Sequence, residues 1–149
     1  MSTTFAELGL PADLVTALAR EGITEPFAIQ SLTIADALAG RDICGKAKTG
    51  SGKTLAFGLP MLARVAKSEP NHPRGLVLVP TRELAMQVSE AIHKYAAGTG
   101  VVVLPLYGGA SMEQQIRALH RGAQVVVATP GRALDHIRRE TLRLDGVRM

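Results

Sequence analysis

Residues 46–54 read Lys-Ala-Lys-Thr-Gly-Ser-Gly-Lys-Thr, and this stretch decides the fold class of the chain. Apolar runs precede and follow it, so the pattern predicts a strand, a glycine-rich turn and a helix. Two glycines, Gly50 and Gly52, let successive backbone N–H groups point at one anion. Lys53 adds a cation at the helix start, and Thr54 adds a hydroxyl of the kind that ligates Mg²⁺. The stretch therefore predicts a phosphate cradle for a nucleoside triphosphate.

Short apolar runs and helical stretches alternate along the chain beyond residue 40. The runs predict buried strands at 42–45, 76–79, 101–104 and 125–128. The stretches between them predict helices near 53–66, 82–97, 111–120 and 132–139. Strands that are apolar throughout and separated by helices indicate an α/β fold, with a mostly parallel sheet and helices on both faces.

The first 40 residues differ from the rest in pattern and in charge. Helical spacing predicts one helix around Leu14 and Leu18 and a second one over 29–38. Residues 1–40 carry a net charge of −4 and residues 41–149 a net charge of +8. We predict a helical segment at 1–40 and an α/β segment at 41–149 within a single domain. The basic segment suits a polyanionic partner, although many proteins with a similar excess bind none.

Length and composition exclude several classes of protein. The 149 residues are the length of one domain, and 46% hydrophobic with 20% charged residues is ordinary for a soluble protein. No apolar run approaches the roughly 20 residues of a membrane span, and the first residues lack the features of a signal peptide. The single Cys44 has no disulfide partner within the chain, so we expect a buried strand residue. A cytoplasmic monomer is expected.

Three segments are expected at the carboxyl ends of the strands, where ligands of parallel sheets collect. They are the cradle and the stretches 80–85 and 129–132, and each offers a hydroxyl, a helix start and a basic side chain. Taken alone, Thr81 and Thr129 are ordinary N-caps, and Pro130 is an ordinary first helical residue. Three such segments on one edge favour a phosphate-bearing ligand, because a cap does not require an arginine each time.

Two further features are ambiguous when each is taken alone. Gly108 and Gly109 let the backbone approach a ligand closely, but they are equally a plain strand-to-helix turn. Gln30 can donate and accept at once, which matches the N6/N7 edge of adenine, and Phe5 can stack on a base. A glutamine at a helix start is more often solvated surface.

Together these motifs resemble the first RecA-like domain of a DEAD-box RNA helicase, from its amino terminus onward. The resemblance covers essentially the whole chain and explains Ala47, since that family's cradle commonly begins with alanine. The motifs that carry it are Phe5 with Gly22, Pro26, Ile29 and Gln30 (the Q motif), 47–54 (motif I), 80–85 (motif Ia), Gly108 with Gly109, and 129–132 (motif Ib).

The resemblance implies ATP and Mg²⁺ as cofactors and RNA as the partner. Phe5 would stack on adenine, Gln30 would read its edge, and Lys53 and Thr54 would be catalytic, with Thr54 on the metal. The other implied ATP-binding residues are Ala47, Lys48, Thr49, Gly50, Ser51 and Gly52. The implied RNA-binding residues are Pro80, Thr81, Arg82, Glu83, Gly108, Gly109, Thr129, Pro130, Gly131 and Arg132. Because the chain has no Trp and few other aromatic residues, RNA contacts should be made to the backbone and be largely independent of sequence.

The chain departs from the family pattern in three ways. Lys48 and Phe27 stand where the family often has Gln and Thr, and both are minor departures. More serious is the end of the sequence at Met149, before any Asp-Glu-Ala-Asp motif or second domain. Those carboxylates would position Mg²⁺ and the attacking water, so we expect the RecA-like domain to be incomplete at its C-terminal end and hydrolysis-deficient.

Two alternatives to the helicase interpretation stay open. Another P-loop ATPase or kinase would share the cradle but have no use for the adenine reader, so GTP-for-ATP competition separates the two. A non-catalytic module that binds RNA or a partner is also compatible with these motifs. Salt-dependent RNA affinity that weakens on Arg82→Ala and Arg132→Ala would support that second alternative.

Overall fold

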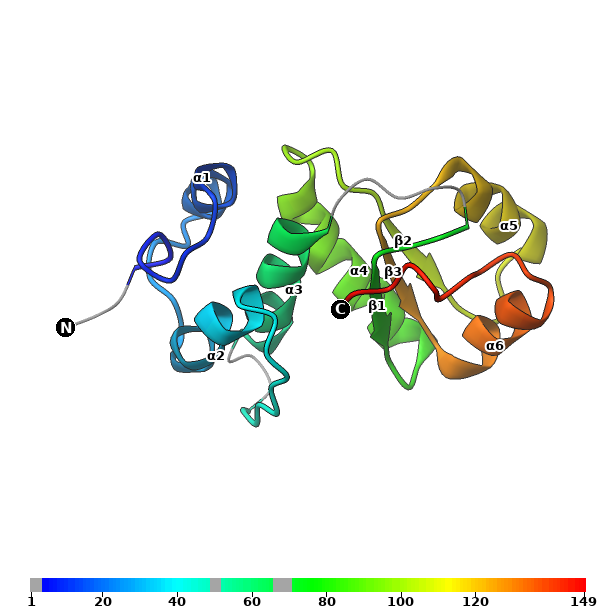
Figure 1. Ribbon diagram of the computed structural model, residues 1–149, viewed down its shortest axis with the longest axis horizontal. Helices are drawn as coiled ribbons and strands as arrows, with labels where there is room; N and C mark the ends of the chain where they lie inside the picture. Colours follow the sequence, from blue (N-terminus) through cyan, green and yellow to red (C-terminus); the bar gives the residue numbers. More distant parts are fainter. Residues whose placement is uncertain (1–3, 49–51, 66–70) are drawn as a thin grey trace. The chain divides into compact units, whose positions relative to one another are not determined.

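The computed structural model describes residues 4–48, 52–65 and 71–149, so Thr49, Gly50 and Ser51 of the predicted cradle lie outside the described residues. The chain forms two compact units (Figure 1). One unit comprises Met1–Arg64 with Lys94–Gly100, and the other comprises Val65–His93 with Val101–Met149. The expected division of a single domain into a helical segment at 1–40 and an α/β segment at 41–149 stays a prediction.

The described part of the first unit includes the helices α1 (Ala12–Arg20), α2 (Ala28–Leu38) and α3 (Lys53–Arg64). Both helices expected before residue 40 are confirmed. Leu14 and Leu18 are buried together because residues four apart lie on one face of α1. Helix α2 packs against α3, and the guanidinium of Arg64 donates to the carbonyl of Ala37 at 3.1 Å. This hydrogen bond joins the C-terminal ends of the two helices, and the predicted cradle ends at the opposite end of α3.

The prediction of a strand at 42–45 is wrong. Residues 41–48 have no regular secondary structure, Ile43 is 42% exposed and Cys44 is exposed rather than buried. An extended segment becomes a strand only when a neighbouring strand takes its backbone hydrogen bonds. In the described part of the chain, the strands 75–78, 103–106 and 125–128 pair only with one another, and none pairs with 42–45. Apolar composition alone therefore does not make 42–45 a strand.

The second unit is built on a parallel sheet, which confirms the predicted fold class. Its strands are β1 (Gly75–Leu78), β2 (Val103–Leu106) and β3 (Val125–Ala128), in the order β1-β3-β2. Val125 lies opposite Gly75 on one side and Val103 on the other. The helices that follow the strands are α4 (Arg82–Ala96, whose last residues belong to the first unit), α5 (Met112–Arg121) and α6 (Pro130–Arg138).

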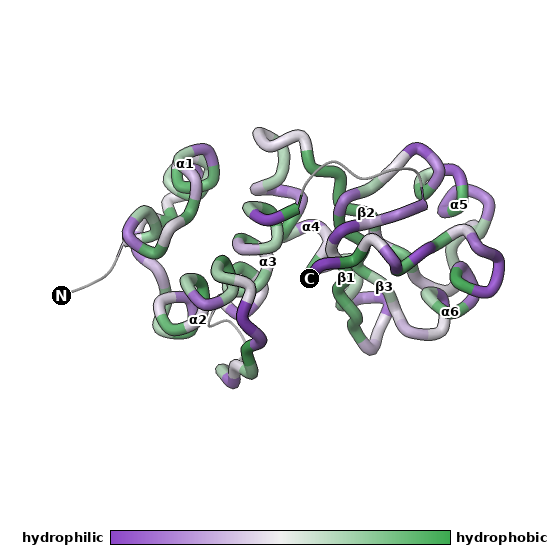
Figure 2. The backbone as a smooth tube through the Cα atoms, in the orientation of Figure 1, coloured by the Kyte–Doolittle hydropathy of each residue, from purple (hydrophilic) through white to green (hydrophobic). Residues whose placement is uncertain are grey.

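Helices cover both faces of this sheet. The chain crosses from β1 to β2 in one direction and returns to β3 in the other, so right-handed crossovers place α4 and α5 on opposite faces. Figure 1 shows α4 on one side, and α5 and α6 on the other. The core on the α5 and α6 side consists of Leu106, Leu119, Val126, Ala128, Ala133 and Leu142. Figure 2 shows the amphipathic helix α5 changing between hydrophilic and hydrophobic residues along its length.

Strand β2 begins two residues later than expected. The Val102 carbonyl accepts from the N–H groups of both Gln124 and Val125, at 3.1 and 3.2 Å, so the regular ladder starts only at Val103. Pro105 is tolerated inside β2 because the strand lies at an edge of the sheet, where one row of N–H groups is not needed for pairing. Within the described ranges, no helix is both long enough and apolar enough to cross a membrane.

Candidate functional site

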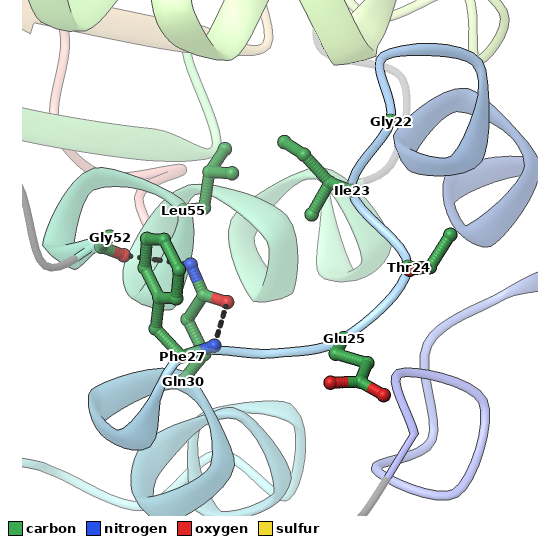
Figure 3. Close-up of a pocket in the computed structure, with 8 residues that line it drawn as sticks. All are labelled: Gly22, Ile23, Thr24, Glu25, Phe27, Gln30, Gly52 and Leu55. Carbon is green, nitrogen blue, oxygen red and sulfur yellow. Dashed lines mark hydrogen bonds between the residues drawn. The ribbon is translucent and has the colours of Figure 1, made fainter.

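A pocket of about 310 Å³ lies in the first unit, between the start of α2 and the start of α3 (Figure 3). This volume is at the lower end of the range of small-molecule sites. Eight residues line the pocket: Gly22, Ile23, Thr24, Glu25, Phe27, Gln30, Gly52 and Leu55. The pocket therefore joins the predicted Q motif to the predicted phosphate cradle.

Gln30 connects these two segments through its buried side-chain amide. Its Oε1 accepts from the N–H of Phe27 at 3.0 Å, and its Nε2 donates to the carbonyl of Gly52 at 3.1 Å (Figure 3). The contact with Phe27 uses one of the two acceptor sites of the amide, and the contact with Gly52 uses one of its two donors. One donor and one acceptor are left. A donor and an acceptor are the two kinds of group that pair with the N6/N7 edge of adenine.

Gly52 is a position where a side chain does not fit. Its φ is +86°, a conformation that L residues rarely adopt. A Cβ on Gly52 would collide with the amide nitrogen of Gln30 and would lie 2.7 Å from Cδ2 of Phe27. The glycine therefore allows the cradle backbone to approach the start of α2.

Lys53 and Thr54 are the first two residues of α3, where a helix favours an anion. Lys53 is exposed and Thr54 is half-buried. The described residues contain no group of three His, Cys, Asp or Glu side chains that could hold a metal ion. The Thr54 hydroxyl is an oxygen donor of the kind that Mg²⁺ takes, and its predicted role as a metal ligand stays a prediction.

The two aromatic residues near the Q motif have different surroundings. Phe5 is 2% exposed and does not belong to the pocket lining, so its predicted stacking on adenine stays a prediction. Phe27, which the sequence analysis treated as a minor departure, is 55% exposed and lines the pocket.

In the second unit, the predicted RNA-binding segments lie at the carboxyl ends of the strands, which are called the carboxyl edge of the sheet below. Because β1, β2 and β3 are parallel, the segments that follow them lie at the same edge. The hydroxyl of Thr81 accepts from the N–H of Leu84 at 3.1 Å, so it also caps α4. The N–H of Thr129 donates to the carbonyl of Leu106 at 3.0 Å, which holds the start of α6 next to the end of β2.

Arg82 and the glycine pair meet at this edge. The Arg82 guanidinium lies 5.4 Å from the centre of the Tyr107 ring, within the range of a cation–π contact. Gly109 has a φ of +82°, and a Cβ on it would be 3.0 Å from Nη1 of Arg82. The predicted residues Pro80, Glu83, Gly108, Pro130 and Gly131 are all exposed beside these contacts.

A buried glutamine that the sequence analysis did not single out joins these segments. Gln115 on α5 is 7% exposed, and its Nε2 donates to the carbonyl of Tyr107 at 3.0 Å. Its Oε1 accepts from Nη1 of Arg132 at 3.3 Å, and the same nitrogen donates to the carbonyl of Ala110 at 3.3 Å. Arg132 is thereby held against the turn that contains Gly108 and Gly109.

His136 on α6 completes this network and is fully buried. Its Nε2 lies 2.8 Å from Oε1 of Gln115, and its Nδ1 lies 2.8 Å from the hydroxyl of Thr141. Since Oε1 can only accept, the ring must donate from Nε2. Burial lowers the pKa of His136, and the charges of Arg132 and Arg139 lower it further, so the ring is neutral at pH 7.

A parallel α/β sheet with helix starts after its strands, and a Gly-rich sequence just before α3, are both typical of the P-loop class of nucleotide-binding proteins. The chain belongs to the DEAD/DEAH box helicase family, whose model matches residues 27–149.

Similar proteins also support this family membership. The chain is 49% identical over 145 residues to the DEAD-box ATP-dependent RNA helicase CshA of Bacillus cereus, covering 97% of this chain and 27% of that protein. It is 53% identical over 148 residues to the ATP-dependent RNA helicase DeaD of Haemophilus influenzae, covering 97% of this chain and 24% of that protein. The chain thus spans about a quarter of the length of these relatives.

Solved structures confirm the RecA-like fold class. The RNA helicase Prp28 from Chaetomium thermophilum, bound to ADP, is 42% identical and superposes with a TM-score of 0.87, covering 96% of this chain and 36% of that one. A DEAD box protein from Methanococcus jannaschii is 38% identical and gives a TM-score of 0.89, covering 99% of this chain and 40% of that one. At these identities, the shared fold accompanies a shared family.

Proposed function

We propose that this chain is the ATP-binding and RNA-binding portion of an ATP-dependent RNA helicase, and that the whole helicase is a cytoplasmic monomer that unwinds or remodels RNA. The observation that carries the proposal is the amide of Gln30, which contacts the cradle at Gly52 and retains one donor and one acceptor. This arrangement supports an adenine reader attached to a phosphate cradle. Family membership supports both ligands.

ATP binding is proposed to involve the pocket and the start of α3 together. The base would occupy the pocket beside Gln30, and the phosphates would lie at Lys53 and Thr54, with Mg²⁺ on the Thr54 hydroxyl. The remaining cradle residues proposed for ATP are Ala47, Lys48, Thr49, Gly50, Ser51 and Gly52. We also propose that these 149 residues bind ATP weakly and do not hydrolyse it, because they contain no Asp-Glu-Ala-Asp motif to position the attacking water.

Competition between ATP and GTP tests the nucleotide site. We expect ATP to displace a fluorescent ATP analogue from the purified chain at about tenfold lower concentration than GTP, since guanine mispairs with the amide of Gln30. Lys53→Ala is the control, and it should weaken both nucleotides alike because they share their phosphates. Equal competition by ATP and GTP would contradict the adenine reader, and phosphate release stimulated by RNA would contradict the proposed lack of hydrolysis.

RNA binding is proposed to use the sheet edge where Arg82 and Arg132 lie. Titration with a labelled oligouridylate at several salt concentrations should give an affinity that falls as salt rises. Arg82→Ala and Arg132→Ala should each reduce the slope of log affinity against log salt by about 0.7, the loss of one phosphate contact. Arg138→Ala is the matched control, because Arg138 lies at the other end of α6 and is exposed. An unchanged slope in the first two variants would rule out phosphate contacts at this edge.

A further inference from the structure

Asn71 joins two segments of the second unit near the ends at which the strands begin, which we call the amino edge of the sheet. Its φ is +66°, a left-handed conformation that asparagine adopts more often than most residues. Its N–H donates to the carbonyl of Leu119 at 3.0 Å, and its carbonyl accepts from the N–H of Arg143 at 2.8 Å. Its side-chain Nδ2 donates to the carbonyl of Thr141 at 2.7 Å. The last turn of α5 is therefore held next to the segment that follows α6.

The segment that follows α6 has a defined conformation of its own. The N–H of Glu140 donates to the carbonyl of Ile137 at 3.0 Å, and the N–H of Thr141 donates to the carbonyl of His136 at 3.0 Å. These two bonds form a Schellman motif, in which the residue after the helix cap is left-handed. Glu140 is that residue, with a φ of +61°. The helix cap and Asn71 together fix the backbone on which the next arginines lie.

Three arginines lie at this junction, and we call them the amino-edge cluster: Arg121, Arg139 and Arg143. Arg121 is the last residue of α5, two positions after Leu119, while Arg139 and Arg143 lie two positions to either side of Thr141. All three are exposed. Within the described ranges, none of their guanidinium groups has a hydrogen bond or an ion pair. The cluster therefore presents three positive charges to solvent.

The composition around the cluster favours phosphate as its ligand. A guanidinium binds phosphate through two parallel hydrogen bonds, which a lysine does not. Residues 117–149 contain no aromatic residue, although protein interfaces concentrate aromatic anchors at their centres. Of the nearby carboxylates, Asp145 already lies 3.7 Å from Nε2 of His72. A nucleic-acid backbone fits this surface better than an acidic protein does.

The cluster lies at the opposite end of the sheet from Arg82 and Arg132. Helix α5 leads from the carboxyl end of β2 back to the beginning of β3, so its last residue, Arg121, lies toward the amino edge. The four residues of β3 separate the two edges by about 13 Å. Helices α5 and α6 lie on the same side of the sheet (Figure 1). A long RNA strand bound at the carboxyl edge could pass along these helices to the cluster, whereas a short one would not reach it.

We propose that the amino-edge cluster is a second RNA contact, which binds the phosphates of a strand that extends beyond the carboxyl edge. The inference rests on the RNA site proposed above at Arg82 and Arg132, and it adds a separate surface. Because the cluster offers charge and no stacking platform, its contacts are independent of base sequence.

RNA length separates the two surfaces experimentally. The full chain is titrated with labelled oligouridylates of about six and about twenty nucleotides, chosen because single-strand sites commonly cover about 4–16 nucleotides. Arg121→Ala and Arg143→Ala should each reduce the slope of log affinity against log salt by about 0.7 with the long RNA. Neither should change the slope with the short RNA. Arg132→Ala should reduce the slope with both.

Arg138→Ala is the matched control, since it removes the same charge from the same helix end. Successive helical side chains point about 100° apart, so Arg138 points away from the face of α6 whose His136 contacts α5. Glu140→Gly tests the cluster in the opposite direction. Glycine suits the left-handed position, and the loss of the carboxylate should strengthen binding of the long RNA only.

Three results would overturn the second contact while leaving the first site intact. Arg121→Ala and Arg143→Ala could leave the long-RNA slope unchanged although Arg132→Ala lowers it. Arg138→Ala could reduce that slope equally, which would show an effect of net charge alone. Polyglutamate could displace the long RNA from the parent chain but not from Arg143→Ala, which would indicate an acidic protein as the partner. If Arg82→Ala and Arg132→Ala change the binding of neither RNA, the RNA site proposed above is itself wrong, and the second contact falls with it.

Discussion

Replacing Gln115 with leucine is expected to lower the free energy of unfolding by about 3 kcal/mol and to weaken RNA binding about tenfold. The leucine has a similar volume but leaves the carbonyl of Tyr107 without its donor and the ring N–H of His136 without its acceptor. Each buried polar group left unpaired costs about 1–3 kcal/mol. Arg132 also loses one of its two acceptors, so it is held less firmly at the sheet edge. Urea denaturation followed by circular dichroism, and titration with a labelled oligouridylate, measure the two effects.

The neighbouring Gln114 provides the matched control for this substitution. It lies on the same helix but is exposed, and the contact to Ser111 uses its backbone N–H rather than its side chain. Gln114→Leu should therefore change neither stability nor RNA affinity by more than a few tenths of a kcal/mol. If Gln115→Leu unfolds at the same urea concentration as Gln114→Leu, the network does not hold this edge together.

The sequence predicts the parallel sheet well because its central strand is buried on both faces. The run of three valines and an alanine at 125–128 is β3 at its expected bounds, and all four residues are completely buried. At 42–45 the same reasoning fails, since apolar composition says nothing about which strand would pair with the segment. At β2 the bounds move because the register with β3, and not the run of valines itself, sets where the ladder begins.

The sequence indicates which charged residues at helix starts come close together, but it does not reveal residues whose contacts depend on packing. The binding roles of all these residues stay predictions. Arg82 and Arg132 stand at helix starts after strands, and the structure brings both to the turn at Gly108 and Gly109. Gln115 is four residues before the buried Leu119, so a polar residue within the apolar stripe of α5 was the available signal. Its partners come from distant segments, and no spacing in the sequence reveals them.

Replacing Gly52 with alanine is expected to weaken ATP binding about tenfold, because the displaced Gln30 amide can no longer pair with the base. The new Cβ would occupy the space of the Gln30 amide and the Phe27 ring, so both must move away from the cradle. The hydrogen bond between Gln30 and the Gly52 carbonyl would then be lost. Equilibrium dialysis against labelled ATP measures the change.

Backbone strain alone could also perturb the first unit, and Gly100→Ala separates this effect from the steric one. Gly100 has a φ of +76°, close to that of Gly52, but nothing lies within 4 Å of a Cβ at that position. It belongs to the same compact unit and does not belong to the pocket lining. Both alanine variants should therefore lose about 1 kcal/mol of stability from the left-handed backbone, while only Gly52→Ala loses ATP affinity. Equal ATP affinities in the two variants would show that the close approach of the cradle to Gln30 and Phe27 does not shape the nucleotide site.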